Sequence, residues 1–330
     1  MKSSMPSERE FLQKIKHLIH SISGAKLGFD DDASDIPMKD GQHVVINVDT
    51  FVRKTDWLPE MTAAQAGRKT AVMTISDVVA KGATPRAAML SLCVPKDYPE
   101  EDAEEIVRGF SQYCLKNSLS FIGGDFGIAD DVVLTGVGIG FAPSGGVITR
   151  DGAKPDDILA VTGEFGLTTV AFEHLLGGKE LEGQLKYDAL AAVLNPHIHH
   201  DFVNALAREG AVHASMDSSD GLGITLHTMA KQSGVAFVLD NLPIPTEVMR
   251  FARNNHVMEF KFVMQGGEEF ILVLSIPEEK WTTASDLAKE QKVPLYRIGY
   301  VTMGEGVRYE TKEGYIDIPE SGYDNVKGWD

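Results

Sequence analysis

Cysteine is scarce in this sequence, and its scarcity excludes two kinds of protein. The 330 residues include only two cysteines, Cys93 and Cys114. Two cysteines are too few for a disulfide framework or for a zinc site made of cysteines alone. Cys93 falls in an apolar segment expected to be a strand, and Cys114 falls on an expected helix. We therefore expect both to be core thiols.

Basic residues are also fewer than acidic ones. The chain has 31 Lys and Arg against 48 Asp and Glu, a formal charge of -17. Nucleic acids and anionic membrane surfaces are bound through clustered Lys and Arg, so we expect neither as a partner. The first residues show no signal-peptide pattern, and no apolar run is long enough to span a bilayer. We expect a cytoplasmic protein in which metal ions mediate any binding of phosphate.

The common nucleotide-binding motifs are missing as well. There is no Gly-x4-Gly-Lys-Ser/Thr loop, no strand followed by Gly-x-Gly-x-x-Gly, and no set of protein-kinase loops. The glycines of residues 136–140 fall in an alternating strand pattern, where glycine is typical of close backbone packing. His197, His199 and His200 have no distant matching ligand and no helical spacing, which favours a polar helix entry over a metal site.

Aspartate is abundant at particular places. Residues 28–35 read Gly-Phe-Asp-Asp-Asp-Ala-Ser-Asp. Carboxylates this close repel one another and raise one another's pKa unless cations meet them. Five further aspartates end apolar runs or stand among small residues: Asp49, Asp77, Asp125, Asp217 and Asp220. Single carboxylates from many loops suit Mg²⁺, whose other ligands are waters and substrate phosphates. This pattern indicates a magnesium-dependent phosphate enzyme.

The length allows two domains, and residues 145–146 mark the expected boundary. We expect an N-terminal domain over residues 1–146 and a C-terminal domain over residues 147–330. Expected strands cover residues 43–48, 86–94, 131–141, 158–162, 214–216, 235–239, 261–265, 270–276 and 295–301. Expected helices cover residues 7–24, 62–82, 99–117, 167–176, 185–209, 221–233, 246–255 and 281–290. The alternation predicts an α/β fold with mixed sheets and not one parallel Rossmann sheet.

Three short segments add polar groups to this pattern. Residues 217–222 bring two carboxylates, two hydroxyls and the first amides of a helix to one point, which suits a metal beside a phosphate or a simple helix cap. Residues 123–125, Gly-Gly-Asp, are interpreted as a turn that lets the backbone approach phosphate. Residues 266–270 are expected to join two strands, with a hairpin carrying exposed acids as the alternative.

Together these motifs resemble the thiamine-monophosphate kinases, within the aminoimidazole ribonucleotide synthetase superfamily, over essentially the whole chain. The matching segments, in order and spacing, are residues 31–33, 48–50, 75–77 with 81–83, 122–125, 149–155, 216–222 and 265–269. The resemblance implies a homodimer whose N-terminal domains pair through strands into a barrel. It also implies an ATP site in a cleft between the two domains.

The resemblance further implies a set of site residues. The magnesium ligands, for several ions, would be Asp32, Asp49, Asp77, Asp125, Asp217 and Asp220. The ATP contacts would be Gly124, Asp125, Arg150 and Ser219, and the thiamine phosphate pocket would hold Asp56, Glu268 and Tyr323. Because the acceptor would be an anionic phosphate oxygen, no residue is required as a general base.

Physical chemistry gives three of these residues a specific task. Arg150 can add a fixed positive fork at the phosphates, or it can pair with Asp151 on the surface. Glu268 can accept a hydrogen bond from an aminopyrimidine edge, and Tyr323 can stack on a ring or pack the tail.

Some positions depart from the family pattern, and other functions stay open. Residues 30–32 are three aspartates where Gly-Asp-Asp is common, so which of them binds metal is open. Phe126 replaces a usual Thr, Glu269 replaces a usual Asp, and Asp56 stands where His is frequent, as in archaeal-type members. The alternatives are ATP-dependent cyclisation of an amide in the same superfamily and a non-catalytic dimer that senses Mg-ATP.

Overall fold

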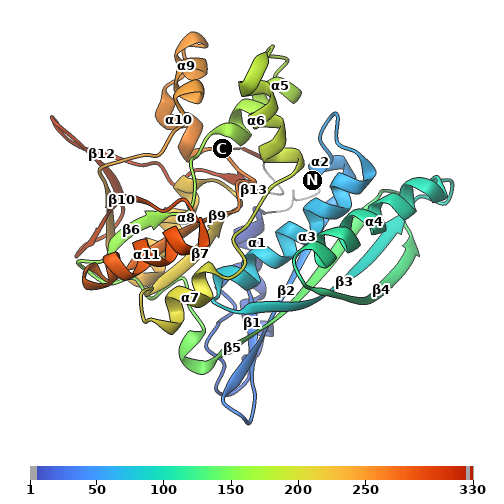
Figure 1. The fold of residues 1–330 in the computed structure, drawn as a ribbon, viewed down its shortest axis with the longest axis horizontal. Coiled ribbons are helices and arrows are strands. Elements are labelled where there is room, and N and C mark those ends of the chain that lie inside the picture. Colours follow the sequence, from blue (N-terminus) through green and yellow to red (C-terminus); the bar gives the residue numbers. More distant parts are fainter. Residues whose placement is uncertain (1–5, 325–327, 330) are drawn as a thin grey trace.

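A long central helix, α3 (Ala63–Ala80), lies between two mixed β-sheets (Figure 1). The structure is a computed structural model that describes residues 6–324 and 328–329. Helix α3 packs on strands of the first sheet and also contacts β7 (Ala214–Ser218) of the second. The α/β fold with mixed sheets that the sequence predicts is confirmed.

The first sheet has five strands in the order β1-β2-β5-β3-β4. Their bounds are β1 (Ser34–Pro37), β2 (Gln42–Val52), β3 (Thr84–Val94), β4 (Ser120–Ile128) and β5 (Val133–Pro143). Only the β3–β4 pair is parallel within this sheet, and α4 (Glu100–Lys116) forms its crossover. Helices α3 and α4 cover one face. The opposite face carries half-buried and exposed apolar side chains such as Val48, which is 63% exposed.

Glycines on β5 let α3 lie directly against the sheet. A Cβ atom built on Gly136 would stand 2.0 Å from Oγ1 of Thr74, and one on Gly140 would stand 2.5 Å from Val78. Thr74 cannot turn aside freely, because its Oγ1 donates a hydrogen bond to the carbonyl of Thr70 at 2.7 Å. The interpretation of these glycines as a close-packing device, rather than a nucleotide loop, is confirmed.

Replacing Gly136 by alanine is therefore expected to destabilise the fold by about 1–3 kcal/mol, the usual cost of overpacking a filled core. The shift of the urea midpoint at unchanged slope measures it. Gly145→Ala is the matched control, since a Cβ atom at Gly145 meets nothing within 4 Å. Equal midpoints for the two variants would contradict close packing of α3 on β5.

The second sheet has seven strands in the order β12-β11-β8-β10-β6-β9-β7. Its further strands are β6 (Ile158–Val161), β8 (Ala236–Leu239), β9 (Ile271–Ile276), β10 (Tyr296–Thr302), β11 (Val307–Thr311) and β12 (Gly314–Asp317). The helices around it are α5 (Leu167–Leu175), α6 (Gly183–Leu194), α7 (Phe202–Arg208), α8 (Leu222–Ser233), α9 (Thr246–Asn254), α10 (Glu259–Met264) and α11 (Trp281–Gln291). Two short helices, α1 (Glu8–Ile15) and α2 (Arg53–Asp56), complete the part relevant to function. None of the described helices is long and apolar enough to cross a membrane.

Four expectations about single elements are wrong. The helix expected over residues 7–24 is shorter: α1 ends at Ile15, and one 3-10 turn follows at Lys16–Leu18. Residues 261–264 belong to helix α10 and not to a strand. Phe262, Val263 and Met264 are all buried, because α10 packs against α5, α8 and α9. A short apolar run has the same sequence pattern in a buried helix and in a buried strand. The helix expected over residues 185–209 is two helices, α6 and α7, with a break at residues 195–201. Residues 123–125 lie inside strand β4 and do not form a turn. The boundary at residue 146 stays a prediction.

Candidate active site

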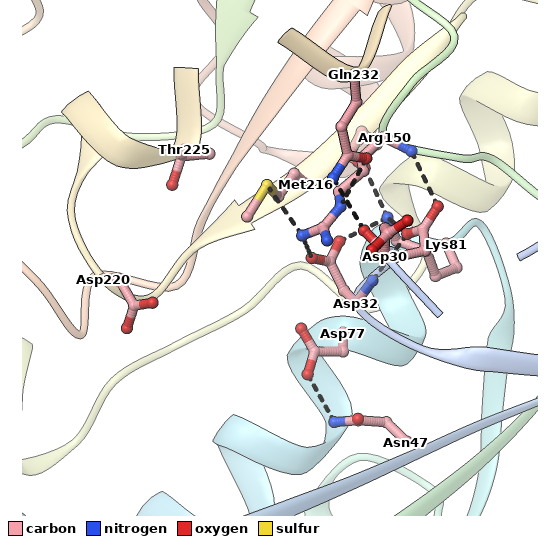
Figure 2. A network of polar contacts seen from close by, with 12 residues as sticks. Asp30, Asp32, Asn47, Asp77, Lys81, Arg150, Met216, Asp220, Thr225 and Gln232 are labelled. Atoms are coloured by element: carbon pink, nitrogen blue, oxygen red, sulfur yellow. Dashed lines mark hydrogen bonds and ion pairs between the residues drawn. The ribbon is translucent and has the colours of Figure 1, made fainter. Parts of the chain in front are cut away.

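Three aspartates from separate parts of the chain converge beside α3. Asp32 comes from the acidic loop before β1, Asp77 from the last turns of α3, and Asp217 from the end of β7. One carboxylate oxygen of each lies within 4.8 Å of the other two. Figure 2 shows Asp77 facing the loop that carries Asp32. Sequence reasoning predicted all three as metal ligands, and the fold brings them together.

The surroundings of this cluster suit a cation. Burial raises the pKa of Asp77 well above its usual range, and the negative charges of Asp217 and Asp32 raise it further. Burial also raises the pKa of Asp217, with the charge of Asp32 as the next cause. Asn47 Nδ2 donates to Asp77 Oδ2 at 2.6 Å (Figure 2). Ser76 Oγ donates to Asp217 Oδ2 at 2.6 Å. Neutral donors orient the carboxylates without cancelling their charge, so the donor set fits a divalent ion.

Two basic residues hold the acidic loop. Lys81 Nζ, which is fully buried, lies 2.6 Å from both Asp31 Oδ1 and Asp32 Oδ2. Arg150 Nη1 lies 2.9 Å from Asp32 Oδ1, and its backbone N–H donates to Asp31 Oδ2. Of the three consecutive acids, Asp32 joins the cluster, Asp31 binds these basic groups, and Asp30 lines a cavity. The ion pair of Arg150 in the described structure is with Asp32 and not with Asp151.

A cavity of about 670 Å³ opens beside the cluster. Its walls come from α1, the acidic loop, Arg150 and the turn that leads into α8, which carries Ser219 and Asp220. Arg9 of α1 reaches this turn, with Nη2 3.7 Å from Asp220 Oδ2. The predicted ATP contacts Arg150 and Ser219 thus line one cavity.

A second cavity, of about 430 Å³, is lined by Asp49, Asp56 and Glu268. Four residues line both cavities, so the two spaces adjoin at the turn after Asp217: Glu8, Ser219, Asp220 and Tyr323. The predicted substrate residues Asp56, Glu268 and Tyr323 are therefore gathered in one place.

Asp49 and Asp56 each have a defined local setting. Asp49 Oδ1 accepts from the backbone N–H of Thr50 at 2.7 Å, and burial raises its pKa to about 7. Asp56 Oδ2 accepts from the backbone N–H of Val52 at 2.6 Å, which closes the turn of α2. Burial is the main cause that raises the pKa of Asp56.

Two of the predicted site residues lie away from both cavities of their own chain. Gly124 and Asp125 lie on β4, the last strand of the sheet, and line neither cavity. A Cβ atom on Gly124 would stand 1.6 Å from the carbonyl oxygen of Leu90, so this glycine permits pairing with β3. Asp125 lies opposite Ser91 of β3 in the pairing register, on an exposed part of the strand.

Known proteins match the chain over most of its length. The family model for AIR synthase related protein, N-terminal domain, matches residues 30–142, and that for the C-terminal domain matches residues 154–312. The thiamine-monophosphate kinase of Nitrosopumilus maritimus (strain SCM1) is 32% identical over 286 residues, covering 87% of this chain and 90% of the relative. The chain belongs to the thiamine-monophosphate kinase family.

Further thiamine-monophosphate kinases agree with this assignment. The one from Pyrococcus horikoshii is 29% identical over 323 residues, 96% of each chain. The solved structure of tt0281 from Thermus thermophilus superposes with a TM-score of 0.84 at 31% identity, covering 92% of this chain and 95% of that one. AaThiL complexed with AMPPCP and TMP has a TM-score of 0.84 at 23% identity, covering 98% and 100%, and shares the fold.

The sequence analysis assigned no role to three residues of this site. Lys69 and Lys81 are both fully buried and pair with site carboxylates, and Asn47 contacts Asp77. One signal pointed to Lys69: it lies three residues after Ala66 and four before Met73, so a helix places it on the same side as these two apolar residues. A lysine on the apolar face of a helix is unusual unless it is paired.

Glu269, next to the predicted substrate residue Glu268, is buried and not part of an exposed hairpin. Its Oε1 accepts from Thr168 Oγ1 at 2.8 Å at the start of α5. Glu268 is bound to the turn that follows Asp217: its backbone N–H donates to the carbonyl of Ser219 at 2.6 Å. Burial raises the pKa of Glu269 to about 8.

This pKa predicts a pH-dependent stability. A carboxyl group with a raised pKa in the fold favours the folded state while it is protonated, and this contribution is lost as the pH rises from about 4.5 toward 8. Relative to wild type, Glu269→Gln should therefore gain stability with rising pH, at roughly 1.4 kcal/mol per unit through that window. Thermal midpoints from pH 5 to 9 measure the difference. A difference that does not change with pH would show that Glu269 is ionised throughout.

Proposed function

We propose that this chain is a thiamine-monophosphate kinase, which transfers the γ-phosphoryl group of ATP to thiamine monophosphate and gives thiamine diphosphate and ADP. One observation carries the proposal: two cavities, one lined by Arg150 and one by Glu268, share the turn that follows the cluster aspartate Asp217. A donor and an acceptor bound in adjoining cavities would meet beside the carboxylates. The relatives that match most of the chain are named as kinases of this kind.

The two cavities receive different ligands in this proposal. ATP would occupy the larger one, where Arg150 supplies positive charge and Ser219 a hydroxyl group. Thiamine monophosphate would occupy the smaller one, beside Asp56, Glu268 and Tyr323. AaThiL, a neighbour of the same fold, binds AMPPCP and TMP, so this fold accommodates an ATP analogue together with a second ligand.

Magnesium belongs to the proposal. The ligands would be Asp32, Asp77 and Asp217 of the cluster, Asp49 and Asp220 at the cavities, and Asp125. Bound Mg²⁺ would neutralise the phosphates that otherwise repel each other and would align them for direct in-line attack.

In the reaction, the protein's own side chains orient the cluster carboxylates and hold the acidic loop in place. Asn47 and Ser76 fix the directions of two carboxylates, and Lys81 fixes the acidic loop. No side chain has to remove a proton, because the acceptor oxygen of the phosphate is already anionic near neutral pH.

We also propose that the chain acts as a homodimer through the five-stranded sheet. Strand β4 ends this sheet, and β1 pairs with β2 only at residues 43–46, so residues 47–52 of β2 have a free edge among the described residues. Among the described residues, the face away from α3 and α4 carries half-buried and exposed apolar side chains. Pairing β4 of one copy with residues 47–52 of another would close a barrel and cover that face.

Such a dimer would give Asp125 a place in the site. Residues 47–52 include Asp49, so edge pairing would bring Asp125 of the partner subunit to the carboxylates of the first copy. This accounts for a predicted ligand that lies apart from the other carboxylates of its own chain. A cytoplasmic location completes the proposal, because ATP is supplied there.

A coupled assay for ADP release tests the proposed function. Purified chain with Mg-ATP is offered thiamine monophosphate, free thiamine, hydroxymethylpyrimidine phosphate or formylglycinamidine ribonucleotide in separate reactions. ADP formation that depends on thiamine monophosphate is expected. ADP formation with formylglycinamidine ribonucleotide alone would support amide cyclisation, and tight Mg-ATP binding without turnover would support a sensor.

A further inference from the structure

A second buried lysine lies behind the smaller cavity. Lys69 of α3 is fully buried, and its Nζ lies 2.5 Å from Oε2 of Glu268. Lys81, by comparison, has two carboxylates and the carbonyl of Ser215 around its ammonium group. Removing a charged ammonium group from water is unfavourable unless close partners of opposite charge offset it. The single ion pair of Lys69 in the described structure thus ties it to Glu268.

The pair fixes how Glu268 faces the cavity. Glu268 lines the cavity and its side chain is 26% exposed, but its Oε2 atom is buried against Lys69. The other carboxylate oxygen is the one left for a ligand. The backbone of Glu268 is also constrained: its φ is 61°, in the left-handed region that a non-glycine residue seldom adopts, and its N–H donates to Ser219. Glu268 is therefore held by its backbone and by Lys69.

Lys69 also acts on the other acid of this cavity. Asp56 lines the same cavity, and burial is the main cause that raises its pKa; the positive charge of Lys69 lowers that pKa, but less than the hydrogen bonds from Val52 and Thr55 do. The ammonium group therefore lies within electrostatic range of both predicted substrate carboxylates. A neutral residue in its place would remove this buried positive charge from the surroundings of both carboxylates.

We propose that Lys69 is a positioning residue for the acceptor: it turns one oxygen of Glu268 inward so that the other accepts a hydrogen bond from an amino group on the acceptor's ring. The inference rests on the proposed function. In this proposal Lys69 does not contact the substrate and has no role at the ATP phosphates. Its loss should weaken binding of the acceptor and leave binding of ATP unchanged.

The test compares Lys69→Met, Glu268→Gln and the double variant, with separate KM values for thiamine monophosphate and for ATP. Each single variant is expected to raise the acceptor KM by about tenfold or more, with the ATP KM unchanged within about twofold, since removal of a binding contact raises KM alone. The double variant should bind the acceptor about as well as Glu268→Gln, because Lys69 acts through that residue. Lys289→Met, at a lysine whose side chain is 78% exposed, is the control.

Three results would overturn the inference. They are an unchanged acceptor KM in Lys69→Met, an equal rise in both KM values, and a double variant much weaker than Glu268→Gln alone. If Lys69→Met or Glu268→Gln does not fold, the double variant, which leaves neither charge without its partner, is compared with wild type. An acceptor KM raised about tenfold or more with an unchanged ATP KM is then expected, and an unchanged acceptor KM would overturn the inference. Wild-type enzyme in the same assay tests the function itself, so a failed function is distinguished from a failed inference by the wild-type rate.

Discussion

Replacing Asp77 by asparagine is expected to lower the turnover number for thiamine diphosphate formation by about a thousandfold, a loss comparable to removing a main electrostatic contact of a transition state. Asp77 is central because its oxygen lies within 4.8 Å of oxygens from both Asp32 and Asp217. Asparagine keeps the shape and can still face Asn47, but it removes the charge that would hold a cation. Steady-state rates at saturating Mg-ATP measure the effect.

The same variant should be at least as stable as wild type when metal is absent. Asp77 is destabilised by burial and by the charges of Asp217 and Asp32, so its neutral analogue relieves repulsion. We expect a higher thermal midpoint in EDTA and a smaller rise on adding Mg²⁺. Asp286→Asn, at an acid whose side chain is 66% exposed, should change neither rate nor midpoint. Near-normal turnover by folded Asp77→Asn would contradict a catalytic metal at this cluster.

Mixing two inactive variants should restore activity. Asp77→Asn and Asp125→Asn are each expected to be inactive as homodimers. If Asp125 acts on the partner subunit, a mixed dimer has one site with both aspartates and one site with neither. Random reassembly of equal amounts should then return about a quarter of wild-type activity, since about half of the dimers are mixed and each has one intact site.

The control for this experiment mixes Asp77→Asn with Asp217→Asn. Both residues belong to one cluster within a single chain, so no mixed dimer has an intact site and activity should stay absent. Restored activity in this control would mean that one active site takes Asp77 or Asp217 from the partner subunit, in addition to β4. No restoration in the Asp77 and Asp125 mixture, with mixed dimers present by mass, would contradict the placement of Asp125 across the dimer.

The acidic cluster could be predicted from sequence because its chemistry is visible locally. Four aspartates in eight residues repel one another unless positive charges or hydrogen-bond donors meet them. Asp32 joins the cluster, whereas Asp35 accepts hydrogen bonds from the backbone N–H groups of Lys26 and Leu27. The order of elements was also accessible, since helical periodicity marks α4 and alternation marks β5. The family resemblance then placed Asp56, Glu268 and Tyr323 in one pocket, and the structure gathers them around one cavity.

What the sequence did not reveal depends on contacts between distant segments. Residues 123–125 read as a turn, yet Gly124 serves the close approach of β4 to Leu90, a neighbour remote in sequence. Lys69 pairs with a glutamate about two hundred residues later, so neither residue predicts the other. Residues 261–264 form a helix because three other helices surround them. In each case tertiary packing, not local propensity, decides the outcome.

The fate of the γ-phosphoryl group tests the central claim most directly. Enzyme, Mg²⁺, thiamine monophosphate and ATP labelled at the γ-phosphorus are mixed, and the labelled products are separated. Direct transfer across the aspartate cluster predicts label in the terminal phosphate of thiamine diphosphate, equimolar with ADP. Label released as inorganic phosphate, with thiamine monophosphate left unchanged, would contradict the account.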